Sequence, residues 1–151
     1  MNGLARAIDT PSRRTASWLG LAGVLPFLIG AIWAWILGGG DMADWLLRAV
    51  VAYGAVILSF LGGLHWGLAL RDQDAGSSHY IISVVPSLLA WLALLLPLGP
   101  ALALLTICFA GQLVVDLLRL QLPAWFRNLR ALLTLLVVVA LVVALLARYQ
   151  A

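Results

Sequence analysis

Four long stretches of this chain carry no formally charged side chain, and they decide what it can fold into. The longest lies between Asp74 and Asp116, and the others cover residues 17–40, 49–70 and 131–147. An apolar run of about 18 residues or more is long enough to cross the ~30 Å hydrocarbon core of a bilayer as a helix. The longest stretch has room for two crossings joined by a short turn that contains proline and glycine. The pattern therefore predicts an all-α integral membrane bundle of five transmembrane helices.

Charge is too scarce in this chain for a soluble protein. Of its residues 64% are hydrophobic and only 10% are charged, whereas soluble domains carry about 25% charged residues. We therefore expect one transmembrane domain and no soluble domain large enough for a conventional active site. The sequence pI of about 9.8 comes from arginines spread over the expected helix ends. Nucleic-acid binding needs a clustered basic patch, so no nucleic-acid partner is expected.

The arginines also predict an orientation in the membrane. When the expected helices alternate in direction, Arg48 and Arg148 lie on one side and the other seven arginines on the opposite side. Short cytoplasmic loops carry the excess of Arg, which predicts the N-terminus inside and the C-terminus outside. The expected segments are an Arg-containing N-terminal stretch at 1–17, helices at about 18–37, 46–70, 81–96, 101–120 and 129–147, and a short tail at 148–151.

The second expected helix carries a stripe of small residues. Ala55, Ser59, Gly63 and Gly67 recur at four-residue spacing and therefore share one helix face. Small residues let the backbones of two membrane helices approach closely. The stripe is interpreted either as packing against another helix of the same bundle or as the seam of a homodimer. His65 lies on the opposite face, so this helix is expected to make contacts on two sides.

The fourth expected helix carries a second polar stripe. Cys108, Gln112, Asp116 and Arg119 share one face, and Asp116 and Arg119 are spaced for an i,i+3 ion pair. Pairing lowers the cost of placing either charge in lipid. Ionisable residues inside a membrane are also candidates for function. A structural ion pair at the helix end and a functional site both remain open interpretations.

Both stripes are expected at a similar depth in the membrane. The second and fourth helices run in the same direction, and His65 precedes Arg71 by six residues, roughly 9 Å along a helix. We therefore predict a shallow polar pocket that faces the cytoplasm, with no catalytic residue and no metal ligand assigned. Its expected members are His65, Trp66, Gln112, Asp116 and Arg119.

The stretch from Ser59 to Gly67, preceded by Tyr53-Gly54, resembles a small family of helical membrane proteins. The family occurs in bacteria and, as transmembrane protein 69, in mitochondria, and it is classed as a domain of unknown function. The resemblance spans about residues 18–147 and implies a multi-pass protein of an inner membrane, which we expect to be a bacterial inner (cytoplasmic) membrane. It implies no activity, substrate or catalytic residue.

Three classes of function stay open at this point. The chain contains no phosphate-binding loop, zinc-protease, CxxC or nucleophile-elbow motif, so we expect a non-enzymatic scaffold, subunit or assembly factor without a cofactor. Its expected partners are the lipid bilayer and either another membrane protein or a second copy of the chain. One alternative is a small transporter or proton-coupled carrier that uses His65 and Asp116. The other is a membrane protein that binds a quinone or a lipid.

Overall fold

The computed structural model describes residues 11–71, 76–119 and 123–149, and this part of the chain folds into α-helices without a strand. Five of these helices are long and apolar enough to cross a membrane. The predicted all-α bundle of five transmembrane helices is therefore confirmed. The helices are α2 (Pro11–Leu37), α3 (Asp41–Ala69), α4 (Ser77–Leu95), α5 (Leu98–Arg119) and α6 (Ala124–Arg148).

Each of the five helices begins several residues earlier than the sequence predicts, α2 and α6 among them. α2 begins at Pro11 rather than at residue 18, because proline is favoured in the first turn of a helix, where its missing N–H costs no hydrogen bond. α6 begins at Ala124, directly after Pro123, rather than at residue 129. Its first turn thus includes Trp125, whose ring the guanidinium carbon of Arg13 approaches to 5.1 Å from the centroid. Residues 1–10 and 150–151 of the expected terminal segments lie outside the described part.

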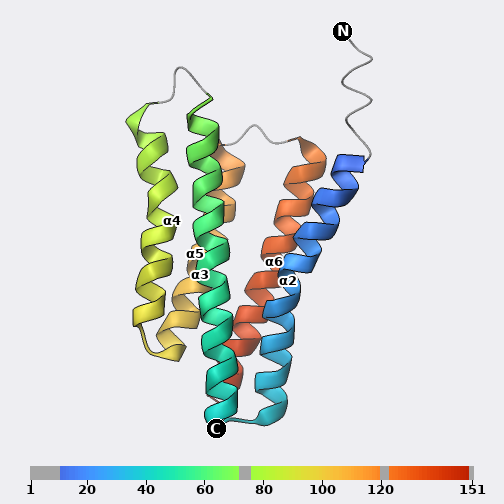
Figure 1. The fold of residues 1–151 in the computed structure, drawn as a ribbon, viewed down its shortest axis with the longest axis vertical. Coiled ribbons are helices and arrows are strands. Elements are labelled where there is room, and N and C mark those ends of the chain that lie inside the picture. Colours follow the sequence, from blue (N-terminus) through green and yellow to red (C-terminus); the bar gives the residue numbers. More distant parts are fainter. Residues whose placement is uncertain (1–10, 72–75, 120–122, 150–151) are drawn as a thin grey trace.

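A glycine turn makes α2 and α3 antiparallel neighbours. Gly38, Gly39 and Gly40 have backbone φ angles of 64°, 113° and 90°. Side chains on these residues would be strained in that region, which glycine adopts freely. The turn therefore reverses the chain within three residues, and the C-terminal half of α2 packs along the N-terminal half of α3 (Figure 1).

The five helices pack in chain order into a ring, which closes where α6 packs against α2 (Figure 1). α3 and α5 also touch across the ring. Phe27 of α2 and Phe109 of α5 meet edge to face at the centre, with ring centroids 5.7 Å apart, and both are fully buried. Such aromatic pairs favour edge-to-face packing. The remaining large side chains of the centre are Leu47, Leu58, Leu102, Leu105 and Leu141.

The small-residue stripe of α3 is divided between the inside and the outside of the bundle. Ala55 is buried and Ser59 is half-buried, but Gly63 and Gly67 are exposed, and a Cβ built on either would meet nothing within 4 Å. The glycine that packs α3 closely is Gly62, where an added Cβ would lie 2.5 Å from the backbone oxygen of a residue in α4. Packing within the bundle therefore involves only the first half of the stripe, and a seam between copies stays a prediction.

Candidate functional site

A buried carboxylate on α5 is the centre of the candidate site. Asp116 is only 2% exposed. Its Oδ1 accepts a hydrogen bond of 2.9 Å from Nε2 of Gln112 and lies 2.7 Å from Nε2 of His65. Its Oδ2 accepts a bond of 2.7 Å from Nε of Arg130. Because an ionised carboxylate only accepts hydrogen bonds, the imidazole donates from Nε2 to this oxygen.

The guanidinium of Arg130 extends the network along α6. Its Nη1 donates to Oγ1 of Thr134 at 3.3 Å, one helical turn further on. Its Nη2 is buried and has no hydrogen-bond partner among the described residues. All five residues of this network are buried, and we call them the Asp116 cluster: His65, Gln112, Asp116, Arg130 and Thr134.

Helix direction explains why these residues meet at one depth. α3 and α5 both end at the side of the bundle where α6 begins (Figure 1). His65 lies four residues before the end of α3, and Asp116 three residues before the end of α5. Arg130 follows the start of α6 by six residues, roughly 9 Å. Three helices thus place opposite charges side by side, and this pairing offsets much of the cost of burying them away from water.

The structure brings together three of the residues predicted for the polar pocket and separates two. His65, Gln112 and Asp116 are in contact, whereas Trp66 is 44% exposed and packs its ring edge to face against Tyr80 at 5.2 Å. Arg119 is exposed at the end of α5. The predicted ion pair between Asp116 and Arg119 is therefore wrong, and Asp116 pairs with Arg130 instead. A long side chain in the last helical turn can reach the polar interface, so it gains little by folding back.

Sequence reasoning missed Arg130 and Thr134, although both had a signal. From the sequence alone, Arg130 is only one of the charges that orient the protein in the membrane. Thr134 is the only polar residue between positions 131 and 147, and it follows Arg130 by four residues on the same helix face. An arginine at the border of an uncharged run, with a hydroxyl one turn deeper, indicates a side chain that points into the bundle.

Comparison with known proteins gives a consistent family assignment. Residues 12–146 match a family described as a protein of unknown function (DUF3429). The chain belongs to this family. It is 39% identical to transmembrane protein 69 of Xenopus tropicalis over 140 residues, which cover 89% of this chain and 54% of that protein. It is 33% identical to transmembrane protein 69 of Mus musculus over 144 residues, covering 91% of this chain and 57% of that protein.

The chain spans little more than half the length of these two relatives. No solved structure matches it. The names of the relatives describe transmembrane proteins and state no activity, substrate or partner. Membership of the DUF3429 family therefore establishes a multi-pass membrane protein of undefined activity, as the resemblance of the α3 motif implied.

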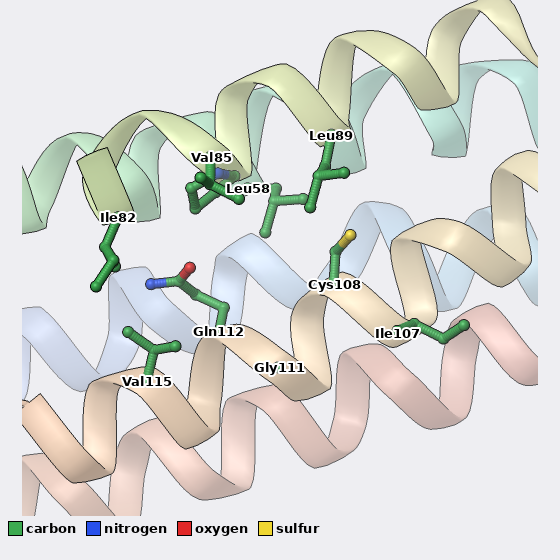
Figure 2. A pocket seen from close by; sticks show the side chains of 10 residues that line it. Leu58, Ile82, Val85, Leu89, Ile107, Cys108, Gly111, Gln112 and Val115 are labelled. Carbon is green, nitrogen blue, oxygen red and sulfur yellow. The ribbon is translucent and has the colours of Figure 1, made fainter. Parts of the chain in front are cut away.

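A small lateral cavity flanks the Asp116 cluster of this DUF3429 protein. It has a volume of 330 Å³ and lies between α3, α4 and α5. Figure 2 shows the side chains of Cys108 and Gln112 on α5 directed toward the helices on the other side of the cavity. Apart from these two, the side chains that line it are apolar. Gln112 thus lies between an apolar cavity and the buried carboxylate.

The cluster combines a buried ion pair with side-chain hydrogen bonds to the same carboxylate. The positive charge of Arg130 and the negative charge of Asp116 cancel, and three donors satisfy the carboxylate. Among the described residues no group of three His, Cys, Asp or Glu side chains could hold a metal ion. The arrangement is therefore suited to holding α3, α5 and α6 at a defined position relative to one another.

Removing the imidazole donor from the cluster should have a modest effect. We expect His65→Leu to lower the unfolding free energy by about 0.6–1.7 kcal/mol, the range found for side-chain hydrogen bonds in membrane proteins. The loss stays small because Gln112 and Arg130 still donate to Asp116. Unfolding in a mild detergent titrated with dodecyl sulfate, followed by circular dichroism, measures it. His79→Leu, at the histidine outside the cluster, is the matched control and should change stability by less than about 0.5 kcal/mol.

Proposed function

We propose that this DUF3429 protein is a non-enzymatic subunit or assembly scaffold of an inner membrane, with its N-terminus in the cytoplasm. The observation that carries the proposal is the use of the buried charges. Asp116 accepts hydrogen bonds from side chains of α3, α5 and α6, and its charge is neutralised by Arg130. Groups engaged in this way stabilise an arrangement of helices, which is what a scaffold needs. The distribution of arginines supports the orientation.

The side chains near the cluster support the non-enzymatic part of the proposal. Thr134 is its only hydroxyl, and this hydroxyl accepts a bond from Arg130 instead of meeting a base. The thiol of Cys108 lies at a cavity whose other lining residues are apolar except for Gln112. An activated nucleophile requires a base within hydrogen-bond reach or a group that favours its charged form. Among the described residues neither side chain has a base within hydrogen-bond reach, and the guanidinium beside Thr134 is already paired with Asp116.

The outer face of α3 supports an interaction with another membrane helix. Gly63 and Gly67 leave the backbone accessible at the surface, next to the exposed side chain of Phe60. Close approach of helix backbones at small residues is a principal source of association in membranes. We therefore propose that a membrane-protein partner or a second copy of the chain packs on this face.

Native mass spectrometry tests the scaffold directly. The protein is purified in a mild detergent from membranes at its native expression level, and the masses of the released complexes are measured. The scaffold predicts a partner chain, or a second copy, at a fixed stoichiometry. A protein that leaves the membrane only as a monomer would contradict the proposal.

A proton-coupled carrier is the second candidate, and one contact favours it. His65 and Asp116, two ionisable side chains within helices that can cross the membrane, lie 2.7 Å apart. Such groups are common in proton relays. Flux in proteoliposomes that is lost in Asp116→Asn and His65→Ala while both variants keep their fold would support the carrier. Loss of assembly or stability without any flux in the unaltered protein would support the scaffold.

A further inference from the structure

A lateral cleft on the other side of the Asp116 cluster suggests a binding site. The cleft has a volume of 420 Å³ and lies between α2, α3 and α6. Its floor is formed by buried side chains, among them Val24, Phe27 and Phe109, whereas Leu19 and Phe60 at its edge are 68% and 70% exposed. α2 and α6 lean away from α3 toward the end where α2 begins (Figure 1). In a bilayer the cleft therefore opens sideways to lipid.

The polar part of this apolar cleft consists of two side chains. Among the described residues Arg130 and Thr134 are the only polar ones that line it, and both belong to the Asp116 cluster. Nη2 of Arg130 is buried and donates to no described acceptor. A buried donor without an acceptor is costly, and membrane interiors provide no water to satisfy it. A ligand that supplies an acceptor at this position would remove that cost.

Charge balance determines which kind of acceptor suits the cleft. The charged or titratable groups that face Arg130 are Asp116 on α5 and, through it, His65 on α3. Asp116 already neutralises the guanidinium. An anionic head group would add a negative charge without a partner in a region of low dielectric constant, which is unfavourable. A neutral carbonyl oxygen accepts a hydrogen bond and leaves the balance unchanged.

The dimensions of the cleft suit a small head group that carries an apolar tail. Its lining on α2 runs from Ala16 to Phe27, twelve residues whose ends lie roughly 16 Å apart along the helix. We propose that this cleft binds a molecule from the lipid phase whose neutral carbonyl head accepts a hydrogen bond from Arg130 and whose apolar tail lies between α2, α3 and α6. Isoprenoid quinones and the acyl esters of phospholipids both have this chemistry. The site goes beyond the scaffold and does not depend on it.

A substitution that fills the cleft can be compared with a matched substitution outside it. Gly23 lines the cleft, and a Cβ built there would meet only the Tyr53 hydroxyl at 3.8 Å. Gly23→Leu should therefore occupy the cleft without disturbing the backbone. Gly111→Leu is the control, because Gly111 is exposed on α5 outside the cleft with nothing within 4 Å. The chain with each substitution is delipidated and offered decylubiquinone or a palmitoyl-oleoyl phosphatidylcholine, and bound mass is read by native mass spectrometry.

The proposal predicts one retained molecule on the unaltered chain and on Gly111→Leu, with affinity weakened about tenfold or more in Gly23→Leu. Retention of decylubiquinone identifies a quinone as the source of the carbonyl, and retention of the phospholipid identifies an acyl ester. Equal retention by all three chains, or no retention by any, would overturn the site. Palmitate retained in preference to both probes would overturn the neutral head group.

Arg130→Lys provides a second variant that keeps the charge beside Asp116. Lysine is a point charge without the planar fork of a guanidinium, so it can pair with the carboxylate but cannot also donate from the position of Nη2. We expect this variant to fold and to bind the retained probe about tenfold more weakly, since a hydrogen bond from a charged donor is lost. Unchanged affinity in a folded Arg130→Lys protein would show that Arg130 does not bind the head group.

Discussion

Asp116→Ala is expected to lower the unfolding free energy by about 3–5 kcal/mol, the cost of removing one partner of a buried ion pair. The substitution leaves the charge of Arg130 buried without compensation and removes the acceptor of His65 and Gln112. Asp116→Asn should cost less than alanine, because the amide oxygen still accepts a hydrogen bond. Dodecyl sulfate titration followed by circular dichroism measures both losses.

A double substitution distinguishes the effect of the ion pair on stability from the effect of the volume that its side chains fill. Asp116→Leu combined with Arg130→Met should recover most of the stability that Asp116→Leu alone loses, because an apolar pair of similar volume avoids burying charge. Arg119→Ala is the matched control, since this arginine is exposed one turn away on the same helix, and it should change stability by less than about 0.5 kcal/mol. A double variant that loses the sum of the two single effects, or an equal loss in Arg119→Ala, would contradict the assignment of the pair.

Replacing each of two adjacent glycines on α3 by alanine should change the unfolding free energy in opposite directions. At Gly62 an added Cβ would lie 2.5 Å from the backbone oxygen of Ser83 and 3.3 Å from the ring of Pro86, so α3 and α4 would have to move apart. Overpacking of this kind costs about 1–3 kcal/mol. At Gly63 the added Cβ meets nothing within 4 Å, and replacing glycine by alanine inside a helix stabilises by about 0.5–1 kcal/mol. The same unfolding titration measures both.

The glycine pair also tests the proposed docking face. In the isolated chain, destabilisation by Gly63→Ala equal to that by Gly62→Ala would contradict the helix packing described above. In the complex, a larger residue at Gly63 should weaken recovery of the partner, because a bulky side chain keeps helix backbones apart. Gly63→Leu that folds normally and recovers the partner in full would exclude this face as the interface.

The fold could be predicted from the sequence because crossing a membrane depends on the length and apolar character of each segment along the chain. Uncharged runs of sufficient length predict helices without any knowledge of tertiary contacts, and each of the five expected helices is found. The depth of a residue in the membrane also follows from its position along its helix, so His65 and Asp116 could be placed at the same level. Their direct contact at 2.7 Å agrees with that placement.

The rotation of each helix about its axis was harder to predict. Asp116 and Arg119 are close enough in sequence to pair, but one faces the centre and the other the surface. The partner of Asp116 comes from α6, and sequence spacing contains no information about which helix lies next to α5. The same limit applies to the small stripe of α3, where Gly62 rather than Gly63 packs against α4. A pattern on one helix shows which residues share a face but not what that face meets.

The central claim is that the ion pair of the Asp116 cluster holds α3, α5 and α6 together and takes no part in catalysis or transport. Recovery of the native complex by the Asp116→Leu, Arg130→Met double variant tests it most directly. The variant is expressed at native level, purified in mild detergent and weighed intact beside the unaltered chain. The double variant is expected to retain the same partner, or the same second copy, at the same stoichiometry as the unaltered chain. A double variant that folds with unaltered stability but no longer assembles, or that loses a measurable flux, would contradict it.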